Sequence, residues 1–137
     1  MTSARPLPVV TRSTQAFWTG GANGQLLIHR CQACGYYVHP PTGFCPACEG
    51  RDVRPEPVSG RATVASFTVN HQQWEPDLEV PYVMALVEVV EQPDVRLATN
   101  IVNCAIDDVT IGMPVRVLFE QHEDVWVPLF EPDGEAA

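Results

Sequence analysis

The sequence contains no lysine, so all eight of its basic residues are arginines. Without lysine, Schiff-base catalysis and the lysine of a phosphate-binding P-loop are excluded for this chain. No apolar run approaches the ~20 residues that cross a membrane, and the first residues lack the apolar segment of an export signal. We therefore expect a cytoplasmic protein with reduced cysteines and no membrane association.

Positive charge is especially scarce in the second half of the chain. The eight arginines are outnumbered by 17 acidic residues, which gives a formal net charge of −9. Residues 75–137 have a balance of −12, whereas residues 1–74 have a balance of +3. Because nucleic-acid binding relies on neutralising phosphates, we expect no nucleic-acid partner, and a polyanionic ligand should prefer the first half of the chain.

Two C-x-x-C pairs are the strongest motif in the sequence: Cys31 with Cys34, followed by Gly35, and Cys45 with Cys48. Each pair bends the backbone so that two thiolates point at one ion. Four thiolates complete a tetrahedral site and leave no position for water or substrate, so we expect one structural metal ion. Zinc is the expected metal, although iron in a rubredoxin-like centre uses the same four sulfurs.

Other readings of these cysteines fit the sequence less well. A redox C-x-x-C pair would open a helix after a strand, and disulfides would require export. The nearby His29 and His39 are predicted to be surface groups or to surround the site without binding the metal. The fifth cysteine, Cys104, is predicted to be a buried thiol, because no nearby cation would lower its pKa. His71 is the best candidate for a general base, but no nucleophile accompanies it, so we expect no catalytic residue.

The pattern of elements predicts a mainly β protein in four parts. An arm and short helix occupy residues 1–25, a zinc ribbon and linker residues 26–57, a β-barrel residues 58–132, and a disordered tail residues 133–137. The linker is expected from residue 49. Barrel strands are expected over residues 58–69, 82–90, 96–102, 115–120 and 125–130, with a helical turn at 106–110. Five short strands with a helical turn between the third and fourth describe an OB-fold barrel.

Several short motifs occur together between Thr14 and Pro132: Phe17-Trp18, Leu26, Cys31-x-x-Cys34-Gly35, Pro40-Pro41, Cys45-Pro46-x-Cys48, Gly60, Ser66-Phe67-Thr68, Pro81-Tyr82, Ile111-Gly112-Met113 and Pro128-x-Phe130-x-Pro132. In this combination the chain resembles a family of proteins with a rubredoxin-like zinc ribbon and an OB-fold. The family was long catalogued as a domain of unknown function and is found beside thiolase-fold enzymes. The resemblance covers nearly the whole chain.

The resemblance implies a noncatalytic accessory subunit, in a hetero-oligomer, of a thiolase-fold partner that acts on acyl-CoA thioesters. In one branch, similar proteins pair with lipid-transfer-type thiolase-fold aldolases that shorten steroid side-chain CoA esters by retro-aldol cleavage, and we favour this branch. In another branch they bridge a thiolase and a hydroxymethylglutaryl-CoA synthase. Two other classes stay open: a nucleic-acid-binding protein, since OB-folds and zinc ribbons both serve that role, and a rubredoxin-like electron carrier.

If CoA contacts this chain directly, its phosphates should favour arginines of the first half. The candidates are Arg12, Arg30, Arg51, Arg54 and Arg61. An extended pantetheine needs an apolar slot, which a gap between ribbon and barrel could provide. The aromatic residues expected either to line such a slot or to fill the core are Tyr36, Tyr37, Trp74 and Tyr82. Phe17 and Trp18, on the expected helix, pack either onto their own domain or onto a partner.

Overall fold

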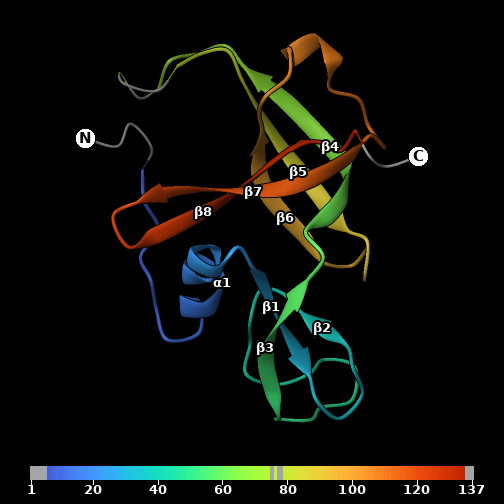
Figure 1. Ribbon diagram of the computed structural model, residues 1–137. Helices are drawn as coiled ribbons and strands as arrows, with labels where there is room; N and C mark the ends of the chain where they lie inside the picture. The colour runs from blue at the N-terminus through green and yellow to red at the C-terminus, as the bar shows by residue number, and fades with distance from the viewer. Residues whose placement is uncertain (1–5, 75, 77–78, 135–137) are drawn as a thin grey trace.

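The computed structural model describes residues 6–74, 76 and 79–134 and contains two β-structures, a small three-stranded sheet and a closed five-stranded barrel (Figure 1). A short helix, α1 (Gln15–Thr19), and the 3-10 helix η1 (Gly20–Asn23) precede the first strand. Helix α1 contacts both β1 of the small sheet and β8 of the barrel. The predicted fold class, a mainly β chain with an N-terminal helix, a ribbon and a five-stranded barrel, is confirmed.

The small sheet forms the ribbon and has the strand order β2-β1-β3, all antiparallel. Its strands are β1 (Leu26–Cys31), β2 (Tyr37–Val38) and β3 (Val53–Val58). Leu26 and Ile28 alternate along β1 and are each 1% exposed, which places one face of this strand in the core. The sheet therefore shares its apolar face with the rest of the molecule and has little core of its own.

Strand β3 lies where the sequence predicted a linker over residues 49–57. It pairs with β1 along its whole length, from Leu26 opposite Val58 to Cys31 opposite Val53. Pro55 and Pro57 obscured this strand in the sequence, because proline cannot donate to a ladder. Their alternate spacing places both missing N–H groups on the free edge of the sheet, where no ladder bond is lost.

The barrel has the strand order β4-β5-β6-β8-β7 and closes through pairing of β7 with β4. Its strands are β4 (Arg61–Asn70), β5 (Tyr82–Val89), β6 (Arg96–Ile101), β7 (Pro114–His122) and β8 (Val125–Pro132), with the 3-10 helix η2 (Ile106–Asp108) between β6 and β7. Buried and exposed residues alternate along β5 and β6, so one face of each strand fills the interior. Val87, Val115 and Phe130 are each 0% exposed at its centre.

Residue Asp133 belongs to the barrel, although the sequence placed it in a disordered tail. Its N–H donates to the carbonyl of Pro114, and its carboxylate lies 3.3 Å from Nε of Arg61. The side chain of Asp133 is almost fully buried. Gly134 is exposed in a turn, and residues 135–137 of the predicted tail lie outside the described residues.

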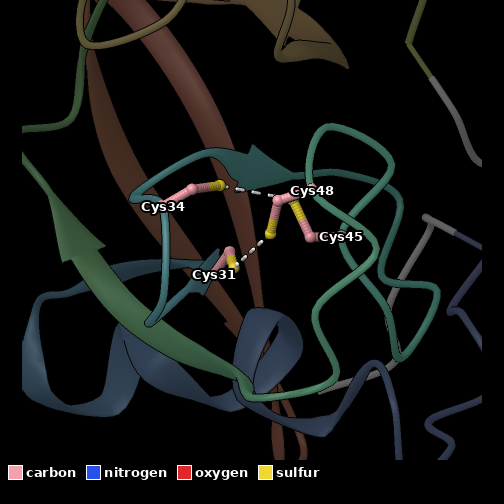
Figure 2. Close-up of side chains that lie close together, drawn as sticks. All are labelled: Cys31, Cys34, Cys45 and Cys48. Atoms are coloured by element: carbon pink, nitrogen blue, oxygen red, sulfur yellow. Dashed lines mark hydrogen bonds between the residues drawn. The ribbon is translucent and has the colours of Figure 1, made fainter.

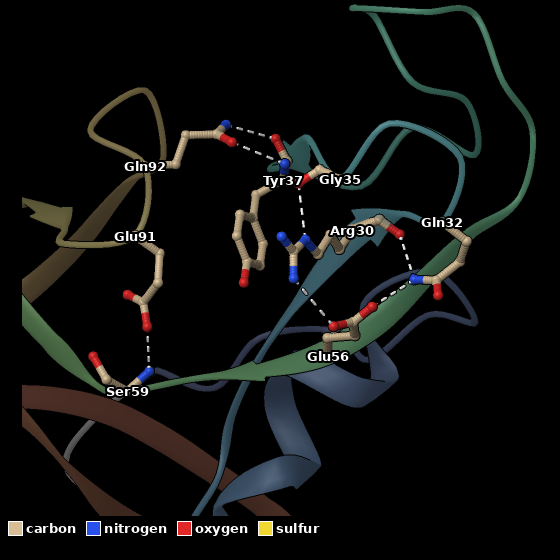
Figure 3. Close-up of polar contacts among 8 residues, drawn as sticks. All are labelled: Arg30, Gln32, Gly35, Tyr37, Glu56, Ser59, Glu91 and Gln92. Atoms are coloured by element: carbon tan, nitrogen blue, oxygen red, sulfur yellow. Dashed lines mark hydrogen bonds and ion pairs between the residues drawn. The ribbon is translucent and has the colours of Figure 1, made fainter.

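The ribbon is attached to the barrel through the side-chain amide of Gln92, in the turn between β5 and β6 (Figure 3). Nε2 of Gln92 donates to the carbonyl of Tyr37, and Oε1 accepts from the N–H of Tyr37, both at 2.9 Å. Beside this clamp, the hydroxyl of Tyr36 donates to Asp94 at 3.1 Å. The Gln92 amide thus pairs with the N–H and the carbonyl of Tyr37 in β2, as the backbone of a neighbouring strand would.

We expect Gln92→Leu to lower the free energy of unfolding by about 1–3 kcal/mol, because it leaves a partly buried N–H and carbonyl of Tyr37 without partners. Urea unfolding followed by circular dichroism measures this difference. Gln121→Leu is the matched control, since the Gln121 amide is exposed and donates to the nearby Glu123 carbonyl rather than to another strand. Equal stability of the two variants would contradict the clamp.

Candidate functional site

The four cysteines of the two C-x-x-C pairs come together in the ribbon (Figure 2). Their Sγ atoms all lie within 4.8 Å of one another. Cys31 and Cys48 are 3.6 Å apart, as are Cys34 and Cys45. Sulfurs held about 2.3 Å from a tetrahedral zinc ion are about 3.8 Å apart. The structure therefore brings together the four residues that the sequence predicted, in an arrangement that can bind a metal ion.

The backbone of each C-x-x-C pair forms the same kind of turn. In the first, the N–H of Gly35 donates to the carbonyl of Cys31 at 2.9 Å; in the second, the N–H of Glu49 donates to the carbonyl of Cys45 at 2.7 Å. The residue after each pair has a positive φ, 83° at Gly35 and 65° at Glu49. Glycine adopts this left-handed conformation without steric cost, which explains its place after the first pair.

The pKa values of the thiols show why this cluster suits a cation. The N–H of Cys34 is the main cause that lowers the pKa of Cys31 to about 7, although burial opposes it. At Cys48 the N–H of Gly50 lowers the pKa, but the sulfurs of Cys31 and Cys34 outweigh it and raise the pKa to about 12. Four thiolates this close repel one another, so a divalent ion is what would allow all four to ionise together.

The two histidines near the cluster do not join it in the described part of the chain. Burial lowers the pKa of His29, and its buried Nδ1 has no hydrogen-bond partner among the described residues. Burial, and then the neighbouring His29, lower the pKa of His39, whose ring lies 5.3 Å from that of Phe17. Both imidazoles therefore favour the neutral form, and His39 packs against helix α1 rather than a metal.

Arg30 is the predicted CoA-binding arginine that is most tightly held within the chain (Figure 3). Its Nε donates to the carbonyl of Gly35 at 2.8 Å, and its Nη1 lies 3.5 Å from Glu56. The guanidinium also lies 4.6 Å from the centre of the Tyr37 ring. Arg30 thus stabilises the turn of the first cysteine pair and packs over the ring of Tyr37.

The other four predicted arginines lie on separate segments. Arg54 pairs with Asp52 at 2.8 Å, and Arg61 pairs with the buried Asp133. Arg12 is exposed in the segment before α1, and Arg51 is exposed before β3. Direct contact of these arginines with CoA stays a prediction, and the ion pairs of Arg30, Arg54 and Arg61 would compete with it.

The slot predicted between ribbon and barrel corresponds to a small cleft of about 180 Å³. Tyr36 and Tyr37 line it together with residues of the β5–β6 turn, including Gln92. Tyr82 and Trp74 do not line this cleft. Tyr82 begins β5 and is half-buried, whereas Trp74 is 75% exposed in the loop after β4, so it fills neither a slot nor the core.

Phe17 and Trp18 both pack onto their own chain. Their rings meet edge to face with centroids 4.8 Å apart. Phe17 packs against the main core, and Trp18 packs against the small cluster formed by Val125, Val127 and Leu129 of β8. Both aromatic residues also line a second, larger groove of about 390 Å³ between α1 and the barrel. Docking of Phe17 and Trp18 onto a partner stays a prediction.

Sequence reasoning missed this larger groove and the residues of β5 and β6 that line it. The apolar run at 82–90 was expected to be buried on both sides or to form a barrel strand, and it forms the barrel strand. Its outward residues Met84 and Leu86 are 46% and 39% exposed. The available signal was the uncharged run of outward positions at the start of β5, from Tyr82 through Met84 to Leu86, in an otherwise acidic half.

The residues considered for catalysis lack a low-pKa nucleophile. Burial, and then Asp108, raise the pKa of the half-buried Cys104 thiol, so the neutral form is favoured. His71 is exposed just after β4.

No helix in the described part of the chain is both long and apolar enough to cross a membrane.

Comparison with family models divides the chain within β3, the last strand of the ribbon. Residues 18–54 match the ChsH2 rubredoxin-like zinc ribbon domain, and residues 55–120 match the ChsH2 C-terminal OB-fold domain. Among solved structures, the chain is similar to the Ltp2-ChsH2(DUF35) aldolase with a TM-score of 0.83 and 35% identity, over 92% of this chain and 98% of that one.

The chain is also similar to three curated proteins. It is 40% identical over 130 residues to a probable enoyl-CoA hydratase alpha subunit of Thermomonospora curvata, covering 93% of this chain and 40% of that protein. It is 36% identical over 126 residues to the 3-oxo-4,17-pregnadiene-20-carboxyl-CoA hydratase alpha subunit of Mycobacterium tuberculosis, covering 92% and 40%. It is 33% identical over 94 residues to a DUF35 domain-containing scaffold protein of Methanocaldococcus jannaschii, covering 67% and 65%. The chain thus spans about two fifths of the length of either hydratase subunit.

Proposed function

Because this chain belongs to the family of ChsH2 proteins, in which a rubredoxin-like zinc ribbon precedes an OB-fold, we propose that it is a noncatalytic accessory subunit of a thiolase-fold enzyme acting on acyl-CoA thioesters. The observation that carries the proposal is the likeness to the Ltp2-ChsH2(DUF35) aldolase over 98% of the matched chain. That protein is an assembly of two named components, which supports a hetero-oligomeric state for this chain.

The partner that we favour is a lipid-transfer-type aldolase that cleaves steroid side-chain CoA esters by a retro-aldol reaction. Two likenesses support this choice: the solved relative is named an aldolase, and the Mycobacterium tuberculosis relative is named for a pregnadiene carboxyl-CoA substrate. A bridge between a thiolase and a hydroxymethylglutaryl-CoA synthase is the second candidate, since another relative is named a scaffold protein. The balance of −12 in residues 75–137 counts against the nucleic-acid alternative.

The metal in this proposal is one zinc ion that contributes to folding and takes no part in the reaction. Cys31, Cys34, Cys45 and Cys48 would hold it. Four thiolates leave a tetrahedral ion no open position for substrate. The residues of this chain would instead present surfaces to the partner, with the ribbon fixed to the barrel by Gln92 and helix α1 lying between them.

The proposal is tested by purifying a thiolase-fold aldolase with and without this chain and measuring cleavage of its acyl-CoA substrate. We expect this chain to be inactive alone, to co-elute with the enzyme in size-exclusion chromatography, and to raise the enzyme's activity by at least ~10-fold. Equal activity of the enzyme without this chain, or thioester turnover by this chain in isolation, would refute the proposal. A salt-dependent gel shift with single-stranded DNA would favour the nucleic-acid alternative instead.

A further inference from the structure

The barrel has a weak seam between β6 and β8. In the described residues these two strands pair only at Ile101 and Phe130, whereas β8 pairs with β7 along nearly its whole length. The N–H of Val102 donates to the carbonyl of Phe130, so Phe130 and, two residues earlier, Pro128 direct their carbonyls toward β6. Pro128 has no N–H to offer there, and its carbonyl accepts the hydroxyl of Thr99 at 3.0 Å. Pro128 thus removes one backbone donor from this seam, and the Thr99 hydroxyl takes a carbonyl that a backbone N–H of β6 would otherwise use.

The larger groove, which we call the seam groove, lies over this gap. Its volume is about 390 Å³, and its walls come from residues 6–8, helix α1, and strands β5, β6 and β8. The lining side chains are all uncharged, and they include Trp18, Met84, Ala98, Thr99, Asn100 and Pro128. An uncharged groove stands out in a chain with a net charge of −9.

The polar side chains of the seam groove are already engaged within the barrel. The hydroxyl of Thr99 donates to Pro128, and Nδ2 of Asn100 donates to the carbonyl of Val83 at 2.8 Å. A CoA phosphate would find no cation among the lining residues. An extended peptide would seek backbone donors along the edge of β8, and Pro128 removes one of them. What the groove offers is hydrocarbon surface, which favours an apolar occupant.

We propose that the seam groove binds the uncharged hydrocarbon portion of an acyl group. The identity of the occupant as an acyl group rests on the proposed function, whereas the apolar character rests on the groove alone. An apolar cavity of about 150 Å³ accommodates benzene, so about 390 Å³ accommodates two or three fused rings or an alkyl chain of similar volume. The thioester and CoA would lie outside, toward the partner's active site.

The test uses the isolated chain and the fluorescent probe N-phenyl-1-naphthylamine, which is an uncharged molecule of three aromatic rings. We expect its emission to rise on binding, lauroyl-CoA to displace it, and CoA without an acyl chain to leave it bound. Ala98→Phe, which places a ring in the groove, should weaken probe binding by at least ~10-fold. Ala105→Phe is the matched control, because Ala105 is exposed on the barrel and does not line the groove.

Circular dichroism checks that each variant is folded, and Met84→Trp, on the neighbouring strand, provides a second way to reduce the volume of the groove. Absence of a fluorescence rise with the wild-type chain overturns the proposal, as does equal probe binding by the wild type and both groove variants. If the wild type takes up no probe and Ala98→Phe no longer co-elutes with the enzyme, the groove is a protein interface instead. The probe-binding measurements do not require the enzyme, so failure of the accessory-subunit proposal is seen separately, in the co-elution and activity experiments.

Discussion

Replacing Cys45 with serine is expected to abolish stoichiometric metal binding and to unfold the ribbon. Cys45 is 0% exposed, and its sulfur lies 3.6 Å from that of Cys34. A serine hydroxyl is a poor ligand for zinc beside three thiolates, and binding at a structural zinc site supplies on the order of 10 kcal/mol of folding free energy. Mass-spectrometric metal analysis should find one zinc atom per wild-type chain and far less in the variant, with a lower urea midpoint.

Cys104→Ser is the control for this experiment, since it also removes one thiol. Cys104 is half-buried and lies outside the sulfur cluster. We expect the control to keep its metal and to lose no more than about 1 kcal/mol of stability. A Cys45→Ser variant with full metal content and wild-type stability would show that the four-sulfur site is not formed. Iron in place of zinc would appear as visible colour in the wild-type protein.

Gly60→Ala is expected to destabilise the barrel by about 2–4 kcal/mol, in two parts. The φ of Gly60 is +83°, a left-handed conformation that costs an alanine about 1 kcal/mol. A Cβ at this position would also lie 2.5 Å from Cγ1 of Val117, and such overpacking costs about 1–3 kcal/mol. The backbone cannot easily retreat, because the carbonyl of Gly60 accepts the N–H of Val117 at 2.8 Å.

Gly112→Ala separates the two parts of this effect. Gly112 has a similar φ of +88°, but a Cβ there would meet nothing within 4 Å. We therefore expect a loss of only about 1 kcal/mol for Gly112→Ala, measured by the same urea unfolding. Val117→Ala removes the clashing methyl group, so the double variant should lose less stability than the sum of the losses of Gly60→Ala and Val117→Ala. Equal losses for Gly60→Ala and Gly112→Ala would contradict the steric part.

The sequence predicted the metal cluster and the barrel well, because both depend on local patterns. C-x-x-C spacing determines where two sulfurs point, and alternating β-branched residues mark strands such as Arg61–Asn70. Strand β3 was missed because two prolines argue against a strand, unless the strand is known to lie at the edge of its sheet. Only the fold shows that Pro55 and Pro57 leave a free edge.

The features that could not be predicted are contacts between distant segments. The clamp joins Tyr37 and Gln92, which are 55 positions apart in the sequence. The seam groove gathers the N-terminal arm, α1 and three barrel strands, none of which carries a motif for binding. Its best local signal is Pro128, whose effect depends on the strand beside it being β6.

The free edge of β3 has a further consequence for how this chain behaves in a crowded solution. Open sheet edges recruit strands from other molecules and so initiate fibrils. Along β3, Pro55 and Pro57 offer no N–H donors on that side, and the exposed Arg54 adds a charged side chain next to them. The ribbon can therefore remain on the outside of a larger assembly without acting as a template for unwanted polymerisation.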